Sequence, residues 1–143
     1  MRSIVTVIAR TLLGLVLFVF GINVFLHFIP LPPMQGRAAQ FIAGLAVSGY
    51  VFPLIGAVET LAGAALLTGR FVPLALAALA PLLVNVVATH LFLAPSGLPL
   101  ALVLLALEIY LAWAYRGAFR PLLRAREELA RPLGRRMTDA HAR

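Results

Sequence analysis

Hydrophobic residues fall into four long runs, which are separated by short segments rich in proline, glycine and arginine. A helix that crosses the hydrocarbon core of a bilayer needs about 20 mainly apolar residues, and each run approaches this length. A helix also satisfies its own backbone hydrogen bonds, which lipid cannot do. The pattern predicts an all-α fold, a bundle of four transmembrane helices at residues 4–29, 50–68, 71–93 and 98–115.

Prolines and glycines mark the ends of these runs. Three prolines between residues 30 and 33 end the first run, because proline lacks a backbone N–H and clashes with the preceding turn. The Ala-Pro-Ser-Gly segment at 94–97 divides an uncharged stretch that is too long for one helix. Pro81 lies deep in the third run, so it should kink that helix and leave the carbonyl of Ala77 without its usual donor.

Two features are typical of the membrane interface. The segment 34–47 is too short and too polar to cross, but its apolar residues share one helical face, with Arg37 and Gln40 on another. This predicts a short helix that lies in the interface after the first crossing. Aromatic residues near the ends of the spans fit the belts that flank a bilayer: Tyr50, Tyr110, Trp113 and Tyr115.

Composition supports lipid as the solvent. Apolar residues make up 62% of the 143 residues and charged residues 12%, about half the usual share in soluble domains, which is roughly 25%. The chain has no cysteine, which excludes disulfides, thiol relays and a catalytic Cys. The first run follows a basic start as in a signal peptide, but it is long enough to span and no small-x-small cleavage site follows, so we expect it to be retained.

The charges predict an orientation. All twelve basic residues are arginines, and four crossings place eleven of them on the side of both termini, with Arg37 alone on the other. Because positively charged loops stay in the cytoplasm, both termini should be cytoplasmic. The arginines flank hydrophobic ends, a membrane pattern that argues against nucleic acid as a partner. The chain thus divides into a transmembrane domain at 1–115 and a basic tail at 116–143, which should form an amphipathic element on the anionic inner leaflet.

Ionisable side chains within the spans are candidates for function, because charge at bilayer depth is costly. Glu59 and Glu108 both lie near the predicted midplane, and Arg10 enters from the cytoplasmic side. Gly56 and Gly63 share a helical face with Glu59, so another helix should approach this face closely and Glu59 should point into the bundle. The sequence predicts an intramembrane ion pair between Arg10 and either carboxylate, and it leaves the choice of partner open.

A second set of polar side chains lies near the outer ends of the first and third spans. Asn23, His27, Asn85 and His90 could form a polar pocket under the outer surface, which would suit a quinone headgroup. A bis-imidazole haem is a less favoured reading, because histidines near the surface more often bond headgroups or loop carbonyls. A metal site is not expected, since the carboxylates lie too deep to join the histidines.

No phosphate-binding loop, nucleophile elbow or two-histidine zinc motif occurs, so the sequence does not indicate an enzyme activity. It does resemble a family over about residues 8–115. The stretches that carry the resemblance to the DoxX family of small bacterial membrane proteins are Ala-Arg-Thr-Leu-Leu-Gly at 9–14, Glu-Thr-Leu-Ala-Gly at 59–63, Gly-Arg-Phe-Val-Pro-Leu at 69–74, Val-Asn at 84–85 and His-Leu-Phe-Leu-Ala-Pro-Ser-Gly at 90–97.

The resemblance implies four transmembrane helices, a polar pair formed by Arg10 and Glu59, and a place in the bacterial plasma membrane. It also implies a link to quinone-associated oxidoreductase complexes, after which the family is named. We therefore expect a small membrane subunit of a redox-linked complex, with a peripheral or membrane oxidoreductase as partner. Two alternatives remain: a small-solute or proton transporter, which would act as a homo-oligomer, and a non-catalytic scaffold.

Overall fold

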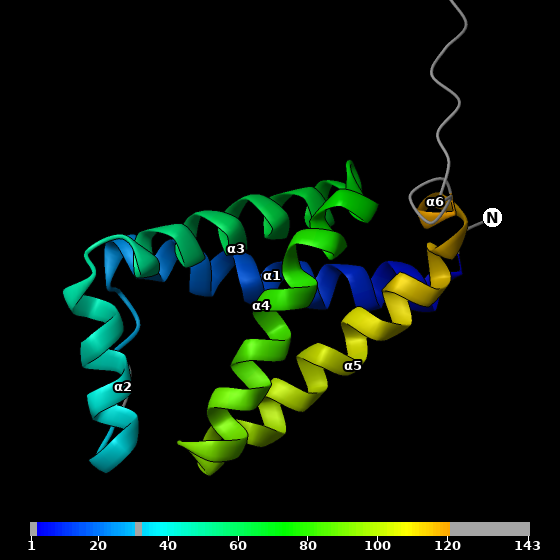
Figure 1. The fold of residues 1–143 in the computed structure, drawn as a ribbon. Coiled ribbons are helices and arrows are strands. Elements are labelled where there is room, and N and C mark those ends of the chain that lie inside the picture. The colour runs from blue at the N-terminus through cyan, green and yellow to red at the C-terminus, as the bar shows by residue number, and fades with distance from the viewer. Residues whose placement is uncertain (1–2, 31–32, 121–143) are drawn as a thin grey trace, which may run out of the picture.

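The structure is a computed structural model that describes residues 3–30 and 33–120. Within these ranges the regular elements are helical (Figure 1). They follow in the order α1 (Ile4–Leu26), α2 (Gly36–Val47), α3 (Val51–Thr68), α4 (Val72–Phe92), the 3₁₀ turn η1 (Pro95–Gly97), α5 (Leu98–Ala114) and α6 (Arg116–Phe119). The description ends at Arg120, so the amphipathic element predicted for the tail at 116–143 lies outside the described residues from position 121 onward.

Four helices are long and apolar enough to cross a membrane: α1, α3, α4, and α5 together with η1. They match the four predicted spans, with the first ending at Leu26 instead of residue 29. The prediction of an all-α, four-helix, multi-pass membrane protein is therefore confirmed. Pro81 does not end α4, which continues from Val72 to Phe92.

Glycines bring α1 and α3 into backbone contact. A Cβ added to Gly63 would lie 2.6 Å from the backbone nitrogen of Phe18, and one added to Gly21 would lie 2.6 Å from the backbone nitrogen of Thr60. Gly14 and Gly56 alternate with them along the same interface. In lipid, such close approach provides the van der Waals contact that holds helices together. The predicted close approach of a neighbour to the Gly56–Gly63 face is thus confirmed, and that neighbour is α1.

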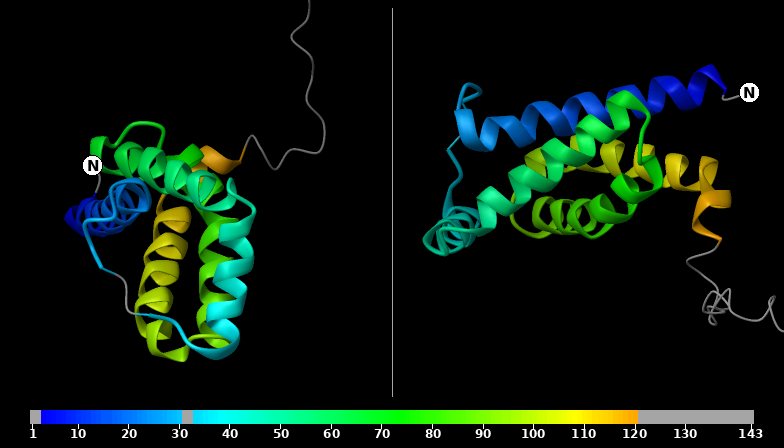
Figure 2. Two further views of the ribbon diagram at one scale, coloured as in Figure 1. Left: turned by 90° about the vertical axis from the view of Figure 1, so that its left-hand side faces the viewer. Right: turned by 90° about the horizontal axis from the view of Figure 1, so that it is seen from above.

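The α4–α5 hairpin extends away from the α1–α3 pair. All four helices converge near the start of α1 and the turn between α3 and α4, and the two pairs separate toward the end that carries α2 (Figures 1 and 2). Buried leucines and small residues fill the junction, among them Leu13, Leu66, Leu79 and Leu111.

The helix α2 crosses the end of the α1–α3 pair instead of extending it (Figure 1). Its segment was predicted as an interfacial helix, and a helix of 12 residues forms there. Arg37 and Gln40 on α2 are exposed, and so are apolar residues of the same helix such as Phe41 and Val47.

Candidate functional site

The four polar side chains predicted to form an outer pocket do not come together. Asn23 is 5% exposed, and its side chain is used within its own segment. The Ile29 backbone N–H donates to its Oδ1 at 2.7 Å, and its Nδ2 donates to the Ile29 carbonyl at 3.2 Å. These two bonds hold the chain as it leaves α1, so Asn23 is a structural residue.

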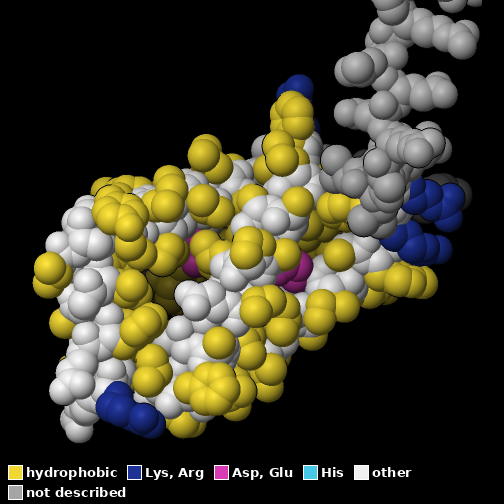
Figure 3. Space-filling view, in the orientation of Figure 1, with side chains coloured by type: hydrophobic (Ala, Val, Ile, Leu, Met, Phe, Trp, Pro, Cys, Tyr) yellow, Lys and Arg dark blue, Asp and Glu magenta, His cyan; other side chains and the backbone are white. Residues whose placement is uncertain are grey.

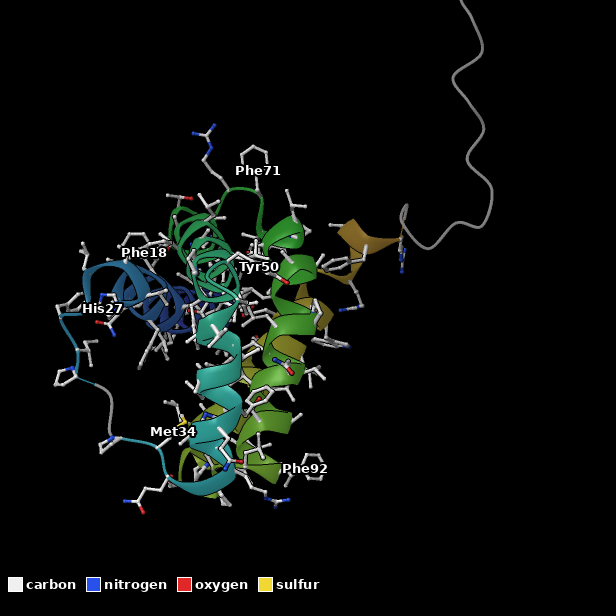
Figure 4. The ribbon with its side chains drawn as sticks, turned by 60° about the vertical axis from the view of Figure 1, so that its left-hand side comes forward. Phe18, His27, Met34, Tyr50, Phe71 and Phe92 are labelled. Carbon is white, nitrogen blue, oxygen red and sulfur yellow. The ribbon has the colours of Figure 1, made fainter. Side chains whose placement is uncertain are left out.

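The two histidines lie on different, diverging helices. His27 is exposed at the end of α1, on the other side of the molecule from Phe92 at the end of α4 (Figure 4). It adopts a left-handed conformation with φ 51°, and its N–H donates to the carbonyl of Asn23. His90 Nδ1 lies 3.0 Å from the carbonyl oxygen of Ala94, in the turn before η1. This arrangement does not place the two imidazoles on opposite faces of one haem.

The predicted ion pair between Arg10 and a carboxylate does not form within the described residues. The Arg10 guanidinium lies beside Gly69, in the turn between α3 and α4, and its Nε makes no hydrogen bond to a residue that the structure describes. Glu59 packs its Cβ against Gly21, which is about 16 Å further along α1 than Arg10 at ~1.5 Å per residue. The arginine extends along the helix surface toward the end of the bundle, as long basic side chains in membranes do.

Glu108 occupies a different environment. It is 3% exposed, and neither carboxylate oxygen has a hydrogen-bond partner in the part of the chain that the structure describes. It lines a groove of about 400 Å³ between α4 and α5, whose other lining residues are apolar: Leu76, Ala77, Ala80, Val84, Leu105, Ile109, Ala112 and Phe119. Sequence reasoning singled out Glu108 as a partner for Arg10, but the groove beside it depends on how α4 and α5 pack.

Asn85 belongs to a second groove, on another face of α4. This groove has a volume of about 340 Å³ and lies between α3 and α4. The space-filling view shows the surface hollowed between these helices, with acidic side chains near the hollow and further along the same face (Figure 3). The amide of Asn85 makes no hydrogen bond with a described residue, and its neighbours in the groove are apolar: Leu54, Ile55, Val58, Ala78, Pro81, Leu82 and Val86.

One polar contact between helices was not predicted. The hydroxyls of Thr6 and Tyr110 lie 3.1 Å apart, joining the start of α1 to α5. Tyr110 was assigned to the interfacial belt, and the sequence contains no signal that pairs it with Thr6, since the two are 104 positions apart. Trp113 fits the belt better, because it is exposed and the Arg116 guanidinium lies 4.4 Å from its ring centre.

The chain matches no protein-family model, and no curated protein or solved structure is significantly similar to it. The likeness to the DoxX family therefore stays a prediction from the sequence motifs. Within residues 3–30 and 33–120, no three His, Asp or Glu side chains are close enough to hold a metal ion. The candidate sites are thus the two grooves on either side of α4, one with an amide and the other with a carboxylate that have no hydrogen-bond partner in the described part of the chain.

Proposed function

We propose that this protein is a small membrane subunit of a redox-linked complex and that it binds a quinone in the groove between α3 and α4. The observation that carries the proposal is the amide of Asn85, which has no hydrogen bond to any residue that the structure describes and lies in an otherwise apolar groove. A polar group in hydrocarbon without a partner costs free energy, so a ligand that bonds this amide is favoured.

A quinone headgroup suits this groove in size and in chemistry. Its ring is apolar apart from carbonyl oxygens, which are acceptors, and the NH₂ group of Asn85 is a donor. A volume of about 340 Å³ falls in the range of small-molecule sites, roughly 300–1,000 Å³. Because Pro81 and Asn85 are exposed on α4, the ring can enter from the bilayer while an isoprenoid tail remains in lipid.

Quinone binding can be measured with the purified full-length protein in lipid nanodiscs. We expect saturable binding of a short-chain ubiquinone, with an affinity about two- to tenfold lower in Asn85→Leu, as for one lost hydrogen bond. Gln40→Leu is the matched control, because it replaces an exposed amide on α2 that lies outside the groove. No saturable binding, or equal binding by Asn85→Leu, would reject the proposed site.

The complex itself is tested by its partners. After purification in mild detergent from the native membrane, mass spectrometry should detect an oxidoreductase subunit that co-purifies at a fixed ratio. Recovery of this chain alone, under conditions that preserve known membrane complexes, would contradict a role as a subunit. The DoxX-like motifs support the redox assignment, and the groove supports the choice of ligand.

The proposal includes a bacterial plasma membrane and cytoplasmic termini, which the arginine distribution supports. Because the chain has no cysteine, single cysteines report the orientation cleanly. Val47→Cys, 87% exposed at the end of α2, should react with a membrane-impermeant maleimide in intact cells. Phe71→Cys, 71% exposed in the turn between α3 and α4, should react only after the cells are opened. The reverse pattern would overturn this orientation.

A further inference from the structure

Among residues 3–30 and 33–120, the Glu108 carboxylate has no partner that offsets its charge. It is buried, and in this part of the chain both of its oxygens are unbonded and its groove contains no other ionisable side chain. Arg10, which the sequence offered as its partner, lies with its guanidinium beside Gly69. An isolated carboxylate charge in a low-dielectric interior is strongly unfavourable unless a positive charge lies beside it, so a bound cation would stabilise the ionised form of Glu108.

The groove beside Glu108 is reachable from the bilayer. Ala77, Ala80, Val84 and Ile109 line it and are exposed on the outer surfaces of α4 and α5. Glu108 lies about 15 Å along α5 from Leu98 at ~1.5 Å per residue, which places it at mid-depth in a span. A ligand for this groove must therefore dissolve in lipid, and the apolar lining matches such a ligand.

The kind of cation follows from how the carboxylate is covered. Both oxygens are screened from contact with solvent, and the exposed lining of the groove is apolar. An ammonium group with free N–H donors would lose its hydrogen bonds to water and find no acceptor on this lining. A cation whose charge is enclosed by apolar groups needs no such acceptor, and it still gains from the nearby negative charge, which acts strongly in a low-dielectric medium.

We propose that the groove between α4 and α5 binds a lipophilic organic cation, of the quaternary ammonium or phosphonium class, through the charge of Glu108. The site lies on a different face of α4 from the Asn85 groove and shares no lining residue with it. It is therefore independent of the proposed quinone site, and a negative result at one site does not bear on the other.

The test compares two probes of the same shape and opposite charge. Tetraphenylphosphonium and tetraphenylborate are titrated into the full-length protein in nanodiscs of neutral lipid, with empty nanodiscs as the baseline. We expect saturable binding of the phosphonium and none of the borate. Trp113, the single tryptophan of the chain, follows the groove residue Ala112, so its fluorescence should change with the same saturation curve.

Variants separate the carboxylate from the rest of the groove. Glu108→Gln keeps the side-chain size and removes the charge, so it should weaken phosphonium binding by at least about tenfold, and Glu108→Asp should retain most of it. Glu59→Gln removes the other described carboxylate, which does not line the groove, and should bind as the wild type does.

A second variant keeps the test decisive if Glu108→Gln fails to fold. Ala80→Phe fills the groove from an exposed position on α4 and leaves the carboxylate in place, so it should also abolish binding. Equal affinity for the two probes, or wild-type affinity in Glu108→Gln or in Ala80→Phe, would overturn the proposal.

Discussion

The contact between α1 and α3 can be tested by one methyl group, in Gly63→Ala. The new Cβ would lie 2.6 Å from the backbone nitrogen of Phe18, 2.8 Å from its Cα and 2.9 Å from the carbonyl oxygen of Gly14. All three atoms belong to the backbone of α1, so no side chain can rotate away. The substitution therefore forces the two helices apart.

The size of the effect follows from these distances. Restoring ordinary van der Waals contact requires α1 to recede by roughly 0.8 Å, and a gap of about 0.5–1 Å forfeits a quarter to a half of the dispersion energy of each contact that opens. Overpacking of a well-packed interface typically costs about 1–3 kcal/mol. We expect Gly63→Ala to lower the free energy of unfolding by an amount in this range.

The proteins are unfolded in mixed micelles by raising the fraction of denaturing detergent, and the loss of helix content is recorded. The curves give the difference in free energy of unfolding between each variant and the wild type. Gly44→Ala is the control, because a Cβ there meets nothing within 4 Å, and alanine favours a helix over glycine by up to about 1 kcal/mol. Gly14→Ala should fall between the two, since its closest contacts, Leu66 Cβ at 2.9 Å and the Gly63 carbonyl oxygen at 3.1 Å, are less tight. A Gly63→Ala protein as stable as the wild type, or more stable than Gly14→Ala, would refute the backbone-contact argument.

Two further predictions concern polar contacts. Asn23→Leu leaves the N–H and carbonyl of Ile29 unbonded, so it should cost about 1–3 kcal/mol and speed amide hydrogen exchange in the segment after α1; unchanged exchange there would contradict the role given to Asn23. Tyr110→Phe removes the hydroxyl contact with Thr6, and a double-mutant cycle with Thr6→Val should give a coupling energy near 0.6 kcal/mol, the usual size between membrane helices. A coupling energy of zero would mean that the contact contributes nothing to stability.

The helices were predictable because their signals are local. Runs of apolar residues, the prolines between residues 30 and 33 and the 94–97 segment were sufficient to locate four spans that the structure contains. The end of α1 was misplaced by three residues, because Asn23 binds Ile29 across the turn and so ends the helix before the prolines do. That bond joins residues six positions apart, and hydrophobic periodicity carries no information about it.

The sequence predicted which residues belong to the candidate sites, but not how those residues are arranged. The sequence singled out Glu108 and Asn85 as polar residues at bilayer depth, and both line grooves in the structure. It paired Glu108 with Arg10 and Asn85 with the histidines, and the structure forms neither arrangement within the described residues. Depth along a helix follows from residue number, but which helices adjoin, and at what separation, does not.

The sequence by itself therefore determined the solvent, the number of crossings and the residues that are costly to place in lipid, because each depends on the transfer of individual side chains and on helix length. Tertiary structure decided what those residues can do. The glycine contacts hold α1 against α3, and the α4–α5 hairpin extends away from this pair, so a groove opens on each side of α4. As a result, the polar side chains that the sequence predicted as one cluster lie apart. The Glu108 carboxylate and the Asn85 amide line two different grooves, which suit ligands of different chemistry.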